Sequence, residues 1–424
     1  MQTNWRITNG RIIDPANGVD QTGDLLIIAG RIASPGQEAP PDTTEIDAAG
    51  CWVVPGLTDM HVHLREPGQE YKEDILSGAR AAAAGGFTSI ACMPNTSPVN
   101  DCAAVTAMIR ARAEQAAVRV YPVGAVSKGS EGHQLAEFGE LKAAGAVAVT
   151  DDGRPVEDSQ LMRRALEYAG DFGLVVISHS EDRSLASGVM NEGVVSTRLG
   201  LKGIPTAAES IVVYREIALA EFTGQRVHIA HVSAAASIDL IRAAKARGVR
   251  VTAETAPHYF TLTDEAVFGY DTNAKMNPPL RSAADREAVR AALADGTLDA
   301  IATDHAPHSI LEKETEFDTA ANGIIGLETA VPLALDLVRD GVVDAGRMVA
   351  LMALNPAAIL GLGAGRLDPG AMADVTIIDP EREFVYTADQ VVSKSRNTPF
   401  LGWRLKGRAV LTMVGGEVRY RLPG

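Results

Sequence analysis

The sequence predicts an α/β fold: a (β/α)8 TIM-type barrel with a small β-domain built jointly by the two chain ends. Three observations predict it. Eight short apolar runs in the middle of the chain each precede a longer, mostly amphipathic segment. Strand-like runs separated by glycine or proline turns occupy both ends. Most of the histidines stand where an apolar run finishes, which is the face on which barrel enzymes build their sites.

The barrel is expected over residues 56–364. Its eight runs are LTDMHVH, FTSIACMP, VRVYPVGAV, AVAVTDD, GLVVISHS, RVHIAHVS, RVTAETAP and AIATDHAP. Stretches with helical periodicity, such as DSQLMRRALEYAGDFG and AASIDLIRAAKARG, lie between them. The main alternative is a doubly wound open sheet, which would normally carry a glycine-rich phosphate loop after its first strand. Here the first run continues as HVHLREPG, which favours the barrel.

The flanking segments, residues 1–55 and 365–424, are expected to form the two halves of one small β-sandwich domain. WRITNGRIID, DLLIIAGRIA and GCWVVPG alternate strand-like runs with turns, and ADVTIIDP and RLKGRAVLTMVGGEVRY do the same at the other end. Neither segment has long helical periodicity. Chain termini often meet in space, so the two halves are assigned to a single domain.

Composition excludes several classes of function. The formal net charge of -15 argues against a nucleic-acid partner, because phosphate binding needs a basic surface. The first residues, MQTNWRITNGRIIDP, lack the apolar core of a signal peptide, and no uncharged stretch is continuous enough for a membrane span. Three cysteines form neither a CxxC motif nor a disulfide framework. We therefore expect a cytoplasmic protein with reduced thiols.

The placement of the nine histidines is the most informative feature. One strand-end histidine would more often be structural than catalytic, but seven at one rim are hard to explain as core packing. His133 lies elsewhere and His228 falls in the middle of a run. The seven that stand at or just beyond the end of a run are His61, His63, His179, His231, His258, His305 and His308.

Strand geometry explains why the HxH spacing is informative. Side chains two residues apart on a strand point to the same face, so His61, His63 and Arg65 should face the barrel mouth together. Two neutral imidazoles at that spacing can share one Zn²⁺. HxH alone is a weak signal, and its flanks PGLTDM and LREPG strengthen it.

Those flanks carry a family resemblance. PGLTDMHVHLREPG and ATDHAPH resemble the two signatures of the amidohydrolase superfamily in its dihydroorotase form. MPNTSPVND, MNPPLR, GIIGLE and SKSRNTPFLGWRLKG also resemble dihydroorotase segments. The resemblance covers nearly the whole chain and is strongest to the longer, bacterial type I dihydroorotases. It implies reversible, zinc-dependent cyclisation of N-carbamoyl-L-aspartate to L-dihydroorotate in pyrimidine (UMP) synthesis.

The same resemblance implies a centre of two Zn²⁺ ions. His61 and His63 would hold one ion with Asp304, and His179 and His231 the other. Asp152 would bridge them together with a hydroxide. Its neighbour Asp151 stays open as the alternative bridge, because adjacent strand residues face opposite ways and strand ends often twist.

Asp304 would also be the catalytic general base and acid. A small-molecule substrate is the implied ligand, and a rigid arginine fork suits its carboxylate. The substrate-binding residues implied by the resemblance are His63, Arg65, Asn95, Asn277, His308, Asn322 and Gly323.

Two departures from the family pattern stand out. Tyr259 occupies a position where relatives often have a second histidine, and Ala321–Asn322 stand where a proline and a variable residue are common. We therefore expect the loop over residues 304–325 to be more flexible than in relatives.

Two other functions remain as alternatives. One is a hydantoinase or allantoinase, although such enzymes generally bridge their metals with a carboxylated lysine and AGAVAVTDDG contains none. The other is a non-catalytic, dihydroorotase-like scaffold for aspartate transcarbamoylase, although such proteins lose metal ligands. A homodimer and a complex with aspartate transcarbamoylase are assemblies that the resemblance leaves open.

Overall fold

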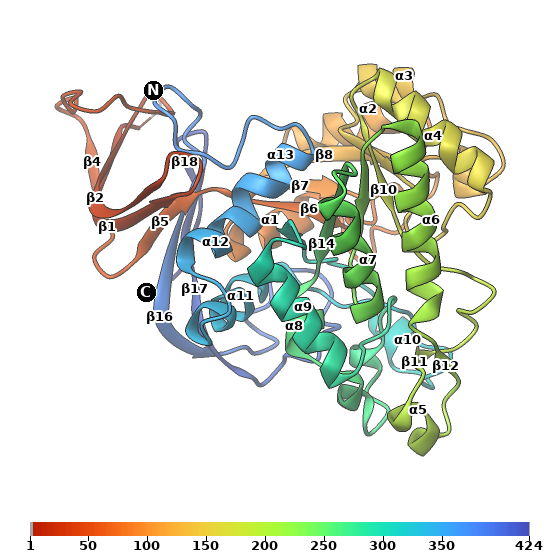
Figure 1. The fold of residues 1–424 in the computed structure, drawn as a ribbon. Helices are drawn as coiled ribbons and strands as arrows, with labels where there is room; N and C mark the ends of the chain where they lie inside the picture. Colours follow the sequence, from red (N-terminus) through yellow and green to blue (C-terminus); the bar gives the residue numbers. More distant parts are fainter. Residues whose placement is uncertain (1–2, 424) are drawn as a thin grey trace.

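The computed structural model describes residues 3–423; residues 1, 2 and 424, the outermost residues of the expected terminal domain, lie outside it. Eight parallel strands form a nearly closed barrel with helices around it (Figure 1). In barrel order the strands are β6 (Leu57–Val62), β7 (Phe87–Cys92), β8 (Arg119–Gly124), β9 (Ala148–Thr150), β10 (Val175–Ser178), β13 (Val227–Ile229), β14 (Val251–Thr255) and β15 (Ala300–Ile301). Each predicted apolar run contains one of them.

The first and last barrel strands meet at their carboxyl ends. Val62 and His305 form a parallel bridge, and the backbone N–H of His63 donates to the His305 carbonyl at 2.8 Å. Below them, Asp59 accepts from the backbone N–H of Thr303 at 3.1 Å. This connection between β6 and β15 excludes the doubly wound open sheet.

The outer layer consists of helices, and side chains cap the starts of three of the long ones, α1 (Ile75–Gly85), α4 (Ser159–Asp171) and α9 (Ala283–Asp295). In α4 the buried residues include Met162 and Leu166, one turn apart on the inner face. Asp158 caps its start by accepting from the Gln160 N–H at 2.7 Å. The other long helices are α2 (Ala103–Ala113), α6 (Ala207–Thr223), α7 (Ala235–Ala246) and α11 (Ala330–Arg339).

Shorter elements fill the connections. The helices among them are α3 (Phe138–Ala144), α5 (Val194–Leu199), α8 (Pro257–Thr261), α10 (Ile310–Lys313), α12 (Ala345–Val349) and α13 (Asn355–Ile359). The single turns are η1 (Lys128–Ser130), η2 (Asp264–Val267), η3 (Thr272–Ala274) and η4 (Ala350–Leu354), and β11 (Met190–Asn191) pairs with β12 (Gly203–Ile204).

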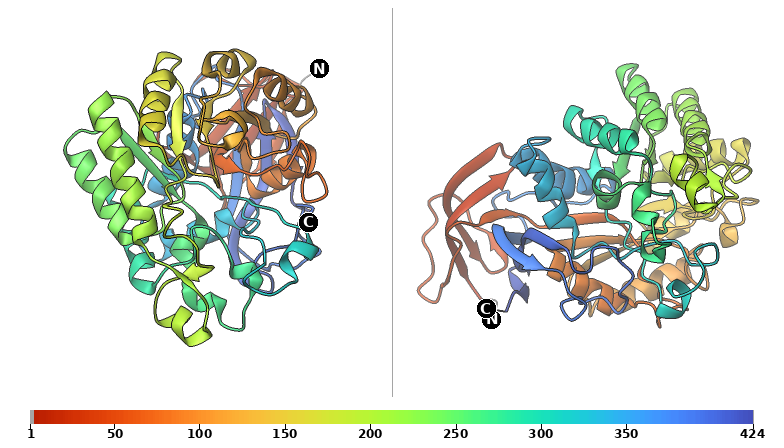
Figure 2. Two further views of the ribbon diagram at one scale, coloured as in Figure 1. Left: turned by 90° about the vertical axis from the view of Figure 1, so that its right-hand side faces the viewer. Right: turned by 90° about the horizontal axis from the view of Figure 1, so that it is seen from below.

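The chain ends build one mostly antiparallel sheet beside the barrel (Figure 2). Its order is β18-β17-β16-β5-β1-β2-β3, with β4 paired to β1. N-terminal β5 pairs with C-terminal β16, which joins the two halves as expected. The strands are β1 (Trp5–Asp14), β2 (Val19–Ile28), β3 (Arg31–Ile32), β4 (Thr44–Asp47), β5 (Trp52–Pro55), β16 (Val375–Val385), β17 (Arg404–Val414) and β18 (Glu417–Arg421).

The barrel and the terminal sheet pack directly against each other. Gly56 is the single residue between β5 and β6, and a Cβ there would lie 2.1 Å from Thr88 Oγ1, so only glycine fits. Thr376 and Thr412 donate to the carbonyls of Gly86 and Ala83 at the end of α1. The predicted barrel with a terminal β-domain is thus confirmed, while the boundaries at residues 55 and 365 stay a prediction.

Candidate active site

Six side chains of metal-ligating type converge at the carboxyl ends of the barrel strands. Their placement follows from the parallel barrel, in which all strands end on the same face. His61 and His63 come from β6 and its end, Asp152 follows β9, His179 follows β10, His231 follows β13, and Asp304 follows β15. All six are buried.

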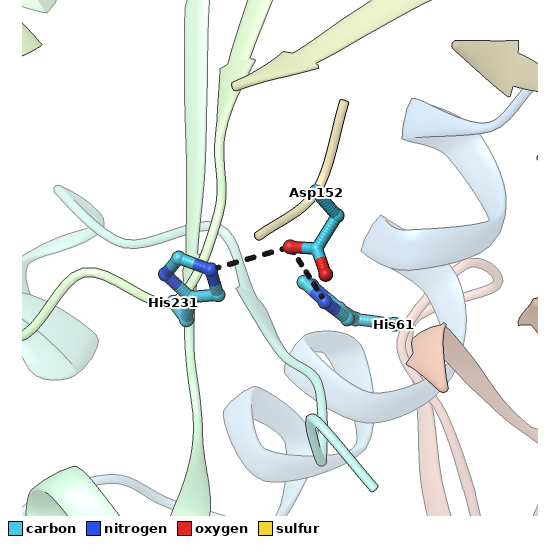
Figure 3. A group of neighbouring side chains, drawn as sticks. All are labelled: His61, Asp152 and His231. Carbon is cyan, nitrogen blue, oxygen red and sulfur yellow. Dashed lines mark ion pairs between the residues drawn. The ribbon is translucent and has the colours of Figure 1, made fainter. Parts of the chain in front are cut away.

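The Asp152 carboxylate lies at the centre of this group. Its Oδ1 is 3.3 Å from His61 Nε2 and 3.6 Å from His231 Nε2, as Figure 3 shows. Oδ1 also lies 3.5 Å from His179 Nδ1, and Oδ2 lies 3.5 Å from His63 Nε2. One carboxylate therefore faces four imidazoles contributed by three strands.

Asp304 lies on the other side of the HxH pair. Its Oδ1 is 3.2 Å from His63 Nε2 and 3.6 Å from His61 Nε2. Two groups of ligand atoms could each hold a metal ion, namely His61, His63 and Asp304, and His61, Asp152 and His231. His179 adjoins the second group, with its Nδ1 2.9 Å from His231 Nε2.

The donor set fits divalent zinc. Imidazole nitrogens and carboxylate oxygens are its ordinary ligands. His61 Nε2 is buried and has no hydrogen-bond partner among the described residues, as expected of an atom that awaits a ligand. Burial alone would raise the pKa of Asp152, but the charge of His61 and hydrogen bonds from His179 hold it well below its ordinary value. The carboxylate is therefore anionic at neutral pH, as a metal ligand must be.

The two adjacent aspartates after β9 point in different directions. Asp151 accepts from the backbone N–H groups of Val126 and Ser127 at 2.8 and 3.1 Å and from the Ser127 hydroxyl. It therefore holds the loop after β8, whereas Asp152 faces the histidines. The structure places Asp152, and not Asp151, where a bridging ligand would have to be.

Beside the ligands lies a cavity of about 210 Å³. All seven of the expected substrate-binding residues line it, together with Asp152, His179, His231, Asp304 and others. Asn277 Oδ1 is buried and has no hydrogen-bond partner within residues 3–423, which leaves an acceptor free for a ligand. Asn95 is already hydrogen-bonded: its Oδ1 lies 2.9 Å from His63 Nδ1, and its Nδ2 donates to Asp152 Oδ2 at 3.3 Å.

Arg65 supplies the positive charge of this cavity. Its side chain is buried, its Nε donates to the Pro307 carbonyl at 3.1 Å, and its Nη2 lies 3.3 Å from His308 Nε2. It forms no salt bridge with any carboxylate of the described residues. Burial lowers its pKa to about 10, so the guanidinium stays charged at neutral pH. An unpaired buried guanidinium is suited to a carboxylate ligand.

Backbone strain is concentrated at this rim. Arg65, His231 and Asp304 have φ angles of 60°, 36° and 48°, in the left-handed region that non-glycine residues rarely occupy. Such strain costs on the order of 1–3 kcal/mol per residue and tends to gather at functional sites. Here it coincides with two candidate ligands and the candidate anion-binding residue.

A buried carboxylate beneath the centre was missed by sequence reasoning. Glu254, on β14, lies 2.8 Å from His61 Nδ1 and 3.3 Å from His228 Nε2. Contact with a carboxylate through Nδ1 fixes the ring so that Nε2 faces the metal position. The available signal was an acidic residue inside an otherwise apolar run, VTAET, together with a mid-strand histidine.

Three of the seven strand-end histidines, namely His61, His258 and His305, do not line the cavity, and of these only His61 is a candidate ligand. His305 lies 3.5 Å from Glu73 and accepts from the Gly326 N–H through Nδ1. His258 is the second residue of α8, and burial lowers its pKa to about 4, so that it is neutral. The side chains of His258 and His305 therefore belong to the buried structure around the cavity and not to its lining.

Comparison with known proteins places this site in a family. The model described as "Dihydro-orotase-like" matches residues 50–237. A protein named dihydroorotase from Geobacter sp. (strain M21) is 62% identical over 422 residues, covering 99% of each chain. Another so named, from Geobacter metallireducens, is 60% identical and covers 99% of this chain and 100% of its own. The chain belongs to the dihydroorotase family.

Solved structures of other cyclic-amide hydrolases share its fold. The L-hydantoinase (dihydropyrimidinase) from Arthrobacter aurescens superimposes with a TM-score of 0.87 at 25% identity, covering 99% of this chain and 96% of its own. A dihydropyrimidinase from Brevibacillus agri gives 0.87 at 23% identity, which shows the fold alone. Among residues 3–423 of this dihydroorotase family member, no helix is long and apolar enough to cross a membrane.

Proposed function

We propose that this chain is a zinc-dependent dihydroorotase that interconverts N-carbamoyl-L-aspartate and L-dihydroorotate in pyrimidine synthesis. The observation that carries the proposal is the carboxylate of Asp152 among four histidines. Hydantoinases and allantoinases generally have a carboxylated lysine at that position, and β9 with its following turn contains no lysine. The full-length relatives named dihydroorotase support the same choice.

The candidate ligands suit two Zn²⁺ ions per chain. His61, His63 and Asp304 would hold one, His179 and His231 the other, and Asp152 would bridge them. Zinc held by these residues would lower the pKa of bound water to about 7 and would polarise the scissile carbonyl. Two divalent ions, two carboxylates and a hydroxide leave one positive charge, which favours an anionic substrate.

The remaining steps belong to side chains of the cavity. Arg65 binds the substrate carboxylate, and Asn277 with the Asn322–Gly323 backbone holds the ring. Asp304 accepts the proton of the attacking water and delivers it to the departing amide nitrogen. In the reverse direction it removes the proton from the carbamoyl nitrogen as the ring closes. One residue therefore serves as general base and general acid.

A substrate panel tests this proposal. Purified protein should turn over dihydroorotate and carbamoyl-aspartate and leave hydantoin and allantoin almost untouched. Preference for hydantoin or allantoin would favour the hydantoinase alternative, and no turnover of any of them would favour a scaffold. The homodimer, the complex with aspartate transcarbamoylase and the cytoplasmic location stay predictions.

Replacing Arg65 by methionine (Arg65→Met) should raise the KM for carbamoyl-aspartate about tenfold to a hundredfold. Losing one buried, charge-assisted contact costs on the order of 1.5–3 kcal/mol. The zinc content should not change, because Arg65 contacts none of the six candidate ligands within hydrogen-bond distance. Steady-state kinetics with metal analysis checks both parts.

Arg119→Met is the matched control. Arg119 donates to both oxygens of Asp374 at 3.0 and 3.1 Å, between β8 and the terminal sheet. Its loss should lower thermal stability and leave the KM unaltered. An Arg65→Met enzyme with normal KM and lost zinc would instead make Arg65 a support of the metal centre.

A further inference from the structure

A buried lysine holds the loop that covers the cavity. Lys313, at the end of α10, is only 3% exposed. Its Nζ donates to the carbonyls of Ala321, Gly323 and Lys275 at 2.7, 3.1 and 3.3 Å. Within residues 3–423 it forms no salt bridge. Its three N–H donors are thus matched by three carbonyl oxygens, and its charge is balanced by backbone dipoles.

Those carbonyls belong to two segments at the cavity, residues 321–323 and residues 275–277. Gly323 lines the cavity itself, and Lys275 stands two residues before cavity-lining Asn277. The segments also meet directly, because the Gly323 N–H donates to the Lys275 carbonyl at 2.9 Å. The ammonium of Lys313 therefore connects the two segments through hydrogen bonds to both.

The Gly323 backbone has little freedom to move. Its φ is +127°, a conformation that favours glycine, and a Cβ there would lie 2.6 Å from the Cβ of Ala306. The neighbouring Asn322 carbonyl lies 2.8 Å from His308 Nε2. A small displacement of this segment would therefore alter several cavity contacts at once.

We propose that Lys313 is a positioning residue for the substrate: its ammonium clamps residues 321–323 to residues 275–277 and thereby sets the backbone and amide groups that face the ring. This inference rests on the proposed dihydroorotase function. Orientation of a bound substrate is sensitive to displacements of about 1 Å. The clamp acts on binding and not on proton transfer, which is assigned to Asp304.

The clamp should respond to pH near neutrality. Burial, with a smaller effect from the charge of Lys275, lowers the pKa of Lys313 from 10.5 to about 7, partly opposed by Asp271. Burial and the charge of Arg65, with smaller effects from Lys72 and Lys313, lower the pKa of His308 to about 3, so His308 is neutral. Glu312, its neighbour on α10, pairs with a lysine outside the loop. A neutral amine has two N–H donors and a lone pair, which repels the third carbonyl.

Binding and stability should then respond to pH in opposite directions. As pH rises through about 7, the ammonium loses its proton and the KM should rise. The folded-state pKa lies below the unfolded value of 10.5, so between those values the unfolded chain binds more protons. Stability contributed by this group therefore increases with pH in that window. Deprotonation of Lys313 therefore does not by itself destabilise the fold in that window, and circular dichroism at each pH checks that the protein stays folded.

Lys313→Met tests the clamp, with Lys245→Met as the matched control. Lys245 is a partly buried lysine that donates to Asp299 and to the Gly296 carbonyl, away from the cavity. We expect Lys313→Met to raise the KM for carbamoyl-aspartate about tenfold with a smaller change in kcat. Its KM should also lose the wild-type increase between about pH 6 and 9. Hydrogen exchange should quicken over residues 317–325, and Lys245→Met should show none of these effects.

A folded Lys313→Met enzyme with wild-type KM would overturn the clamp. If the variant does not fold, the wild-type profile decides: a KM that stays constant from about pH 6 to 9 would overturn the proposal equally. Wild-type protein without dihydroorotase turnover contradicts the proposed function instead. In that case the clamp can still be tested by measuring hydrogen exchange over residues 317–325 of the wild-type protein as a function of pH. If the exchange rate rises with pH no faster than the intrinsic exchange chemistry does, the clamp is refuted.

Discussion

Asp304→Asn should remove nearly all turnover in both directions while leaving the fold intact. General acid–base groups contribute about 10²–10⁴-fold to a rate, and weaker metal binding would add to the loss. The fold should survive because Asp304 has a φ of 48°, and asparagine is among the few residues that tolerate this conformation. The kcat for ring opening and for ring closure, measured with circular dichroism, checks the expectation.

Asp299→Asn is a suitable control because it changes an aspartate beside the start of the same strand, far from the cavity. Asp299 accepts from Lys245 Nζ at 2.6 Å and from the Ala253 N–H at 2.8 Å. That variant should be less stable and catalytically normal. Near-normal turnover by Asp304→Asn would refute its role, and loss in one direction only would require separate groups for the base and the acid.

Asp152→Ala should deprive the protein of zinc, beginning with the ion held by His179 and His231. Its carboxylate lies within 3.3–3.6 Å of all four histidines, so its loss removes a ligand from the centre of the candidate metal site. Activity should fall with the metal. Zinc per chain, measured by elemental analysis after dialysis, gives the result directly.

Asp151→Ala is the control variant, because Asp151 is the aspartate adjacent to Asp152. It should retain zinc and lose stability, because the Val126 and Ser127 N–H groups would be buried without acceptors. Leaving a buried donor unsatisfied costs about 1–3 kcal/mol. If Asp151→Ala lost the metal and Asp152→Ala kept it, the bridge would be assigned to the wrong aspartate.

The sequence was most informative where strand periodicity decides which way a side chain points. The apolar runs located all eight barrel strands, and the HxH spacing correctly placed His61 and His63 on one face. Periodicity could not separate Asp151 from Asp152, because they sit where β9 has already ended at Thr150. Only the turn after the strand determines which of them points at the histidines.

Other features depend on contacts between distant segments. Glu254 is separated from His61 by 193 residues, and nothing local in VTAET indicates that it will support that ring. The same holds for Lys313, whose carbonyl partners include one that is 38 residues earlier. Lysine in a polar loop suggests an exposed side chain. Its burial follows from the way the loop after β15 folds back on residues 275–277.

We propose a dihydroorotase with two zinc ions that are bridged by an unmodified aspartate. A lysine bridge would need carbon dioxide for carboxylation, whereas Asp152 carries its ligand oxygens already. The most direct measurement is titration of the metal-free protein with Zn²⁺ in bicarbonate-free buffer, following dihydroorotate turnover. We predict that activity returns fully and reaches its plateau at two zinc ions per chain. Full activity without metal, or recovery only after bicarbonate is added, would contradict the assignment of two zinc ions bridged by Asp152.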